Sequence, residues 1–219
     1  MGYTHYWYTV PELPTDKWQS FKKDCKAILA YCEELGIAIG DFGGNEKSKP
    51  VINDNELGFN GRDDQEAGIW TTEQDIIIPW PSPSASIKEM TADPINKTEG
   101  NWFAGDLVSQ RVAPIRDGKG SGSYETFCIE RKQEVKEQWL KSKKDDPKYG
   151  KLFAFCKTAY RPYDLAVTAC LIAAKQHFGN DIYLSTDGDD KDWMDGRIMC
   201  NNLFGYGLSL TLDFELKQV

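Results

Sequence analysis

Residues 155–164, FCKTAYRPYD, place a thiol, two cations, two phenols and a carboxylate directly before an almost uncharged stretch. Pro162 is typical of the first turn of a helix, where free N–H groups and the positive end of the helix dipole meet. With Lys157 and Arg161 just upstream, such a helix start could bind a phosphate or another anion. The structural alternative is that Lys157 is solvated, Arg161 pairs with a surface carboxylate and Asp164 caps the helix.

The chain contains two histidines, His5 and His177, so an imidazole general base would have to be one of them. His177 falls near the C-terminal end of the predicted helix, where a cation offsets the helix dipole, and this favours a structural role. His5 lies in an aromatic segment, which favours a hydrogen-bonded core residue. Cys156 beside Lys157 could be an activated thiol, but the sequence places neither histidine next to it.

Metal and nucleotide motifs are absent from the sequence. The six cysteines have no CxxC pair or zinc-like spacing, and the acidic run DGDDKDWMD (187–195) lacks the spacing of a calcium loop. There is no Walker glycine loop, no GxSxG and no HExxH. We therefore expect neither a metal nor a cofactor, and we expect reduced, buried cysteines.

Length and composition are those of an ordinary globular protein. The 219 residues are 40% apolar and 27% charged, and no run reaches the roughly 18 apolar residues that span a bilayer. The start, MGYTHYWYTV, has neither the basic residues nor the apolar segment of a signal peptide. We expect a cytoplasmic protein without membrane association, and no pattern indicates an oligomeric state.

The net charge of −8 argues against general nucleic-acid binding, because neutralising phosphates requires a positive surface. One segment differs, since residues 131–151 carry eight basic and four acidic side chains. This segment predicts either a short amphipathic helix, with Val135 and Trp139 facing inward, or a patch that contacts RNA or DNA.

The hydrophobic pattern of the first half predicts one strand, one long helix and two further strand regions. Residues 2–10 alternate and are rich in aromatics, which indicates a strand. Apolar residues at helical spacing predict a helix over about 15–35, with Thr15 as its N-cap and Gly36 just beyond its end. The further strands are expected at 51–61 and 124–131.

Residues from about 62 to 123 follow no regular pattern and are rich in Pro, Gly and Ser, which indicates a loop-rich insertion. It contains Trp70, Trp80 and Trp102, which need something to pack against.

The last third predicts a buried helix and an antiparallel sheet. The absence of charge from Leu165 to Ala174 indicates a central helix over about 162–178, with Asp164 near its free N–H groups. Residues 181–185 read as a strand and 190–205 as a helix, and 208–216 alternate as a strand with one solvent-exposed face would. We therefore predict a single α+β domain over 1–219, in which a mainly antiparallel sheet packs against the central and N-terminal helices.

Four segments resemble a group of uncharacterised proteins common in phage and bacterial genomes: MGYTHYW at the start, FNG at 59–61, ETF at 125–127 and FCKTAYRPYDLAV at 155–167. The similarity covers the first strand, the middle strands and the C-terminal third. The group has no established activity, so the resemblance supplies no function. It does imply a recurring set of polar residues, namely His5, Asn60, Glu125, Lys157, Tyr163 and Asp164.

This recurring set is more polar than a protein core requires. We expect His5, Glu125 and Lys157 to be the catalytic candidates, meeting in one cleft so that an imidazole and a carboxylate share one substrate. The candidates for ligand binding are Asn60, Arg161, Tyr163 and Asp164. The same residues could instead form a buried polar network that fixes the fold.

Two functions remain open at this point. The leading hypothesis is a cytosolic protein that binds a small anionic ligand such as a nucleotide, with turnover of that ligand as an added hypothesis. The alternative is a non-enzymatic interaction protein, for instance a viral-type accessory, inhibitor or structural factor. Its contact surface would be the Trp-rich insertion, because aromatic anchors dominate protein interfaces.

Overall fold

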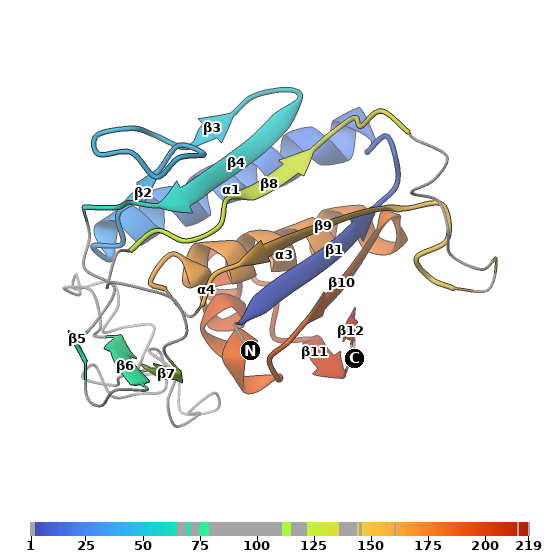
Figure 1. The fold of residues 1–219 in the computed structure, drawn as a ribbon. Helices are drawn as coiled ribbons and strands as arrows, with labels where there is room; N and C mark the ends of the chain where they lie inside the picture. Colours follow the sequence, from blue (N-terminus) through green and yellow to red (C-terminus); the bar gives the residue numbers. More distant parts are fainter. Residues whose placement is uncertain are drawn as a thin grey trace.

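The structure, a computed structural model, describes residues 3–64, 69–70, 75–78, 111–114, 122–135, 144, 146–159, 161–213 and 215–218. Helices and antiparallel strands form a single α+β domain, which confirms the predicted fold class (Figure 1). The sheet that contains β1 (Thr4–Thr9) and the sheet that contains β4 (Glu56–Gly61) form one layer. Helices α1 (Thr15–Glu34) and α3 (Asp164–Phe178) lie behind this layer in this view. Each of these sheets therefore has one face toward the helices and one face away from them.

The first sheet has the strand order β10-β1-β9, with β1 at Thr4–Thr9, β9 at Leu152–Lys157 and β10 at Ile182–Thr186. Along β1, His5 and Trp7 are buried against the helices, whereas Tyr6 and Tyr8 lie on the opposite face and are partly exposed. The predicted strand at 2–10 is confirmed. Its alternation decides which side chains reach the core and which reach solvent.

The second sheet contains β2 (Ile39–Gly40), β3 (Val51–Ile52), β4 (Glu56–Gly61) and β8 (Phe127–Glu130), with β4 between the others. The predicted strands at 51–61 and 124–131 are confirmed, and the first of them is a hairpin in which β3 pairs with β4. The two sheets meet just before β8, where the Glu125 N–H donates to the Lys157 carbonyl oxygen at 3.3 Å.

Helix α3 is the buried central helix that its uncharged sequence predicts. Its side chains are buried from Asp164 through Ala174, and it contacts both α1 and α4 (Met194–Phe204). The helix begins at Asp164, two residues after the expected start at about 162. The N-cap residue is Tyr163, whose side chain makes no capping bond, and the Asp164 carboxylate bonds other side chains, as described below.

Helix α1 matches the predicted range, and Gly36 follows it with a φ of 80°, a conformation that glycine adopts without strain. The N-cap differs from the prediction. Pro14 holds that position and makes no side-chain capping bond. Thr15 is the first helical residue. The core between α1, α3 and the sheets is rich in aromatics, including Trp18, Phe21 and Phe178.

The C-terminal strand prediction requires a correction. Residues 208–216 were expected to form one strand, but the chain reverses between β11 (Leu210–Asp213) and β12 (Glu215–Gln218), which pair with each other. Leu212 pairs with Leu216 across the turn. Because a tight hairpin keeps the period of two on both arms, the alternation alone does not show the reversal. Helix α4 follows the 3₁₀ turn Lys191–Trp193 and confirms the predicted helix at 190–205.

Parts of the two irregular regions lie outside the described residues. Within the predicted insertion, β5 (Ile69–Trp70), β6 (Asp75–Ile78) and β7 (Arg111–Pro114) form a small antiparallel sheet. Trp80, Trp102 and Trp139 are not among the described residues, nor is the side chain of Trp70. Val135 is 45% exposed, so it does not face inward as the amphipathic-helix interpretation requires. Among the described helices, none is long and apolar enough to cross a membrane.

Candidate functional site

His5 and Asp164 form a pair at the centre of the molecule. The imidazole Nε2 lies 2.7 Å from Asp164 Oδ1, and both side chains are 0% exposed. His5 points from β1 toward the helices. Asp164, the first residue of α3, points toward the sheet. Since a carboxylate only accepts hydrogen bonds, Nε2 is the donor when Asp164 is ionised.

Other side chains close off this pair. The Thr158 hydroxyl donates to the same Asp164 Oδ1 at 2.5 Å, and the rings of Tyr3 and Trp193 pack edge-on against the imidazole, with centroids 4.7 and 5.3 Å away. Among the described residues, His5 Nδ1 has no hydrogen-bond partner. A donor–acceptor pair that is enclosed by aromatic rings stabilises the fold but has no path to a substrate.

Cys156 lies opposite His5 in the β1–β9 register and is also buried. Its thiol donates to the Glu125 carbonyl oxygen at 3.3 Å. Burial raises the pKa of this thiol well above its ordinary value, and the Tyr163 hydroxyl opposes the change only in part. Cys156 is therefore a structural thiol, and the interpretation of an activated nucleophile next to Lys157 is wrong.

Five of the predicted site residues meet around Tyr124, where the two sheets join. The Glu125 carboxylate accepts the Lys157 backbone N–H at 2.7 Å, and the buried Tyr163 hydroxyl donates to the Glu125 carbonyl oxygen at 2.7 Å. The Asn60 amide bonds both the N–H and the C=O of Tyr124, each at 3.2 Å. These bonds fix the backbone of the junction, as a side-chain substitute for strand pairing.

Two cations lie over the Tyr124 ring. Lys157 Nζ is 5.0 Å from the ring centroid and the Arg161 guanidinium carbon is 5.7 Å from it, both within cation–π range. Arg161 is largely buried, and this burial lowers the pKa of its guanidinium, while Tyr163 and Tyr124 act in the opposite direction. We refer to Asn60, Tyr124, Glu125, Lys157, Arg161 and Tyr163 as the Tyr124 cluster.

The predicted convergence of His5 with Glu125 and Lys157 is not found. Lys157 pairs with Thr4 in the β1–β9 register, so its side chain and that of His5 point to opposite faces of the sheet. A cleft shared by both would have to pass through the sheet. The structure thus divides the predicted set into a closed His5–Asp164 pair and the Tyr124 cluster.

The second histidine is held in the same way. His177 Nε2 lies 2.7 Å from Asp24 Oδ2, and the Tyr206 hydroxyl donates to the same oxygen at 2.8 Å. This carboxylate joins α3, α1 and the segment after α4. The structural role expected for His177 agrees with this geometry, although its partner is a carboxylate rather than the helix dipole.

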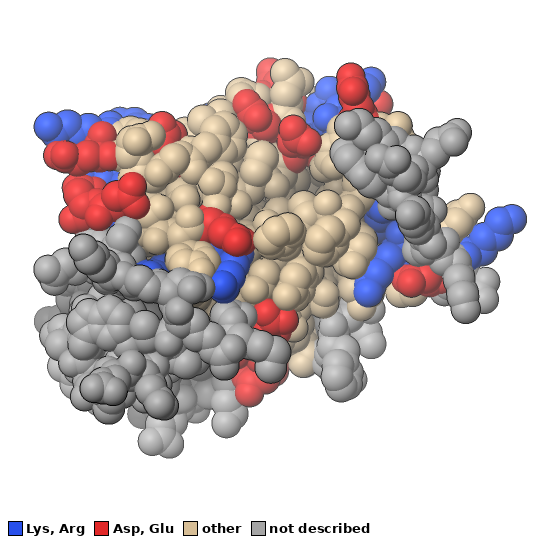
Figure 2. Space-filling model, viewed as in Figure 1, with Lys and Arg blue, Asp and Glu red and all other residues tan. Residues whose placement is uncertain are grey.

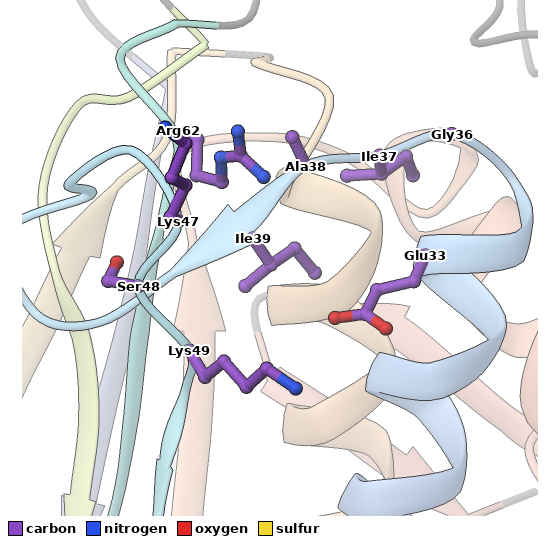
Figure 3. Close-up of a pocket in the computed structure, with 9 residues that line it drawn as sticks. All are labelled: Glu33, Gly36, Ile37, Ala38, Ile39, Lys47, Ser48, Lys49 and Arg62. Atoms are coloured by element: carbon purple, nitrogen blue, oxygen red, sulfur yellow. The ribbon is translucent and has the colours of Figure 1, made fainter.

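A pocket that the sequence analysis did not predict opens beside the C-terminal end of α1 (Figure 3). It encloses about 400 Å³ and is lined by Glu33, Gly36, Ile37, Ala38, Ile39, Lys47, Ser48, Lys49 and Arg62, which we call the α1 pocket. Lys49 and Glu33 extend into it from opposite walls, and Lys47 and Arg62 lie near one another at its other end.

The partners of the charged groups differ. Arg62 forms a two-pronged ion pair with Asp64, and this raises the pKa of the guanidinium and lowers that of the carboxyl. Lys47 Nζ is 3.6 Å from Glu46 Oε1 at the surface. Lys49 has no hydrogen-bond or ion-pair partner among the described residues, so its ammonium group is available to a ligand.

Local geometry explains how the loop after β2 forms this wall. A Cβ added at Gly40 would lie 2.6 Å from Ser48 Oγ, so glycine permits the loop to close against β2. The Ser48 hydroxyl donates to the Asn45 carbonyl oxygen at 2.6 Å and accepts the Asp41 N–H at 2.9 Å. Lys47 has a φ of 63°, a left-handed conformation that is strained for lysine.

The sequence contained a signal for this pocket that we interpreted only as a loop. The segment GDFGGNEKSKP (40–50) combines glycines with two lysines separated by one residue, and Arg62 follows the next strand. Adjacent antiparallel strands bring such residues together, but no motif has this spacing. Among the described residues, no group of three or more His, Cys, Asp or Glu side chains could hold a metal ion.

Comparison of the chain with protein-family models, with curated proteins and with solved structures found no match. The similarity to the phage-associated group and the residue roles that it implies therefore stay predictions.

Proposed function

We propose that the protein binds a small anionic ligand, such as a nucleotide or a sugar phosphate, in the α1 pocket. The observation that carries the proposal is the lining of this pocket: three basic side chains and one carboxylate surround a hollow of about 400 Å³. Pockets for small ligands measure roughly 300–1,000 Å³. A local excess of cations is informative in a chain whose net charge is −8.

The three cations would contribute differently to binding. Lys49 is the leading contact, because no described carboxylate neutralises it. Arg62 is held in place by Asp64, so its remaining N–H groups are pre-oriented toward a ligand rather than free to rotate. Lys47 is highly exposed, with a side chain that is 86% accessible, and would act mainly through long-range attraction.

The proposal also includes the cellular compartment of the protein. All six cysteines are thiols, and five of them are buried. Such thiols persist in a reducing compartment, which supports a cytoplasmic location. Turnover of the ligand has less support, because neither histidine lines the α1 pocket and both are held by aspartates.

Thermal unfolding with added anions tests the proposal. Inorganic phosphate, a nucleoside monophosphate and a sugar phosphate are titrated separately, and at least one should raise Tm, since ligand at about 100 times Kd adds about 2.7 kcal/mol to the free energy of unfolding. Lys49→Gln keeps an unbranched polar side chain, one atom shorter, but removes its charge, so it should weaken binding by about tenfold. If none of the anions shifts Tm, the proposal is wrong.

Lys157→Gln is the matched control, because it removes one cation from the Tyr124 cluster and leaves the α1 pocket unchanged. Binding to this variant should equal that of the unmodified protein. Loss of binding in Lys157→Gln with retention in Lys49→Gln would instead place the ligand at the Tyr124 cluster and contradict the assignment to the α1 pocket.

A further inference from the structure

The face of the first sheet that points away from the helices carries five aromatic side chains. They are Tyr6 and Tyr8 from β1, Phe153 and Phe155 from β9, and Tyr183 from β10, and we call them the aromatic face. Phe153 and Phe155 are each 50% exposed. Exposed apolar patches of this kind mark surfaces that bind a partner. Figure 2 shows largely uncharged surface over β9, β1 and β10, with basic side chains at its right edge.

Three rings of the aromatic face, those of Tyr6, Phe153 and Phe155, are roughly parallel, whereas the Tyr8 ring is tilted by 47° from Phe153 and by 75° from Tyr183. The planes of Tyr6 and Phe153 differ by 19° with centroids 6.1 Å apart, and those of Phe153 and Phe155 differ by 23° with centroids 5.7 Å apart. A flat group that lies parallel to the Phe153 ring is therefore within 23° of the planes of the other two. The β-sheet backbone holds the side chains, so little conformational entropy is lost when a planar partner binds.

The outward face of these three strands is aromatic in composition, since every large uncharged side chain that they direct outward is aromatic. Aromatic side chains are enriched at protein interfaces and also at sites for unpaired bases, which stack on them at about 1–3 kcal/mol per base. The charged groups beside the rings therefore decide between these partners.

Basic side chains border the row of rings at both ends. Lys148 Nζ lies 5.0 Å from the ring centroids of both Tyr8 and Tyr183. At the other end, Lys157 is on the outward face of β9, opposite Thr4. Two acidic groups lie at that end: the Asp187 carboxylate accepts the Tyr6 hydroxyl, and the Glu125 carboxylate accepts the Lys157 backbone N–H. A cation at each end of the row suits a chain with a phosphate on either side of its stacked bases.

We infer that the aromatic face binds a short single-stranded nucleic acid, whose bases stack on Phe153, Phe155 and Tyr6 and whose phosphates contact Lys148 and Lys157. The net charge of −8 does not oppose such local contact, because charges farther away than about 8 Å are largely screened at physiological salt. Lys148 belongs to the basic segment 131–151, for which contact with RNA or DNA was one of the two interpretations.

This inference concerns a different surface from the α1 pocket and goes beyond the proposed function. A double-stranded nucleic acid should bind poorly, because its bases are already stacked and its phosphates need a broader positive surface. The site is therefore expected to prefer unpaired strands and to depend only weakly on salt.

Fluorescence anisotropy with labelled oligothymidine and oligouridine of about ten nucleotides tests the inference, since single-strand sites commonly cover about 4–16 nucleotides. Phe155→Ala should weaken binding by about tenfold or more, and Phe155→Tyr should restore it, because loss of one stacking ring costs about that factor. Lys148→Gln should lower the slope of log Kd against log salt by about 0.7. Phe155 is half-exposed, so its variants should unfold at nearly the same temperature as the unmodified protein.

Phe155→Leu separates stacking from simple apolar contact, because leucine keeps apolar area and loses the ring. It should bind the oligonucleotides as weakly as Phe155→Ala. The inference is overturned if neither oligonucleotide binds at low salt. It is also overturned if sedimentation shows a dimer of this chain that Phe155→Ala disrupts and Phe155→Leu preserves, since a second copy would then cover the aromatic face.

Discussion

The His5–Asp164 pair and the α1 pocket contain similar chemical groups in opposite surroundings. In the pair, an imidazole and a carboxylate are 0% exposed, 2.7 Å apart and enclosed by aromatic rings. In the pocket, Glu33 from a helix and Lys49 from a loop extend into the hollow from opposite walls. The pair uses His5 Nε2 and Asp164 for each other inside the core, whereas the pocket leaves a cation for a ligand.

This contrast teaches that the polarity of a residue does not by itself identify a site. Burying an unpaired charge is costly, so a polar residue in an apolar strand or helix usually has a partner within the fold. A residue that serves a ligand has to keep its donor free and reach solvent. That combination is more common in loops that a rigid scaffold positions, and the segment after β2 is such a loop.

The largest effect is expected when the closed pair is broken. Asp164→Ala removes the acceptor of both His5 and Thr158, and it should lower the free energy of unfolding by about 3–5 kcal/mol, because removing one member of a buried pair leaves the other without a partner. Urea unfolding followed by tryptophan fluorescence measures the loss. Asp54→Ala is the matched control, since Asp54 pairs with Lys22 at the surface and its removal should cost less than about 1 kcal/mol. Equal losses in the two variants would contradict the structural role of Asp164.

Much of the fold could be predicted from the sequence, because period and composition report burial directly. The uncharged run in α3, the aromatic alternation in β1 and the helical spacing in α1 were sufficient for these elements. The hairpin of β11 and β12 was missed because both arms keep the same alternation. Asp164 was expected to cap its helix, since the sequence does not show that His5, far away in the chain, lies beside it.

The site was less predictable than the fold for a related reason. Asn60, Glu125, Lys157, Arg161 and Tyr163 do come together around Tyr124, but mostly through backbone bonds that hold the sheet junction. Which face of β1 carries His5 depends on the strand register, and a shift of one residue would have reversed it. The α1 pocket depends on the conformation of the loop at 40–50, whose glycines and lysines match no motif with a known structure.

A smaller effect, which grows at alkaline pH, is expected from Cys128 on β8. Its thiol is partly buried, between the closed His5–Asp164 pair and the open α1 pocket in exposure. Partial burial raises its pKa from 9.0 to about 12, with Glu130 and Glu56 acting in the same direction. A raised pKa means that the folded state holds the proton more tightly, so the thiol's contribution to stability is complete below about pH 9 and is lost as the pH rises toward about 12.

Urea unfolding of the unmodified protein and of Cys128→Ala, measured from pH 7 to 11 in steps, tests this expectation. The variant should lose about 0.5–1 kcal/mol at neutral pH through its smaller apolar contact. Above pH 9 its stability should fall less steeply than that of the unmodified protein. Parallel curves would show that Cys128 has an ordinary pKa in the folded state.

The smallest effect on stability, together with a clear effect on binding, is expected from Lys47→Asn. Lys47 has a φ of 63°, a left-handed conformation that asparagine adopts more readily than lysine does. Within the described part of the chain, its ammonium group has only an exposed contact with Glu46, so its loss should change the free energy of unfolding by less than about 0.5 kcal/mol. If the α1 pocket binds an anion, the same substitution should weaken that binding several-fold, with the larger loss at low salt because Lys47 acts through long-range attraction. Calorimetric titration at two salt concentrations measures the difference. A variant that binds as tightly as the unmodified protein at low salt would exclude Lys47 from the site and leave Lys49 and Arg62 as its cations.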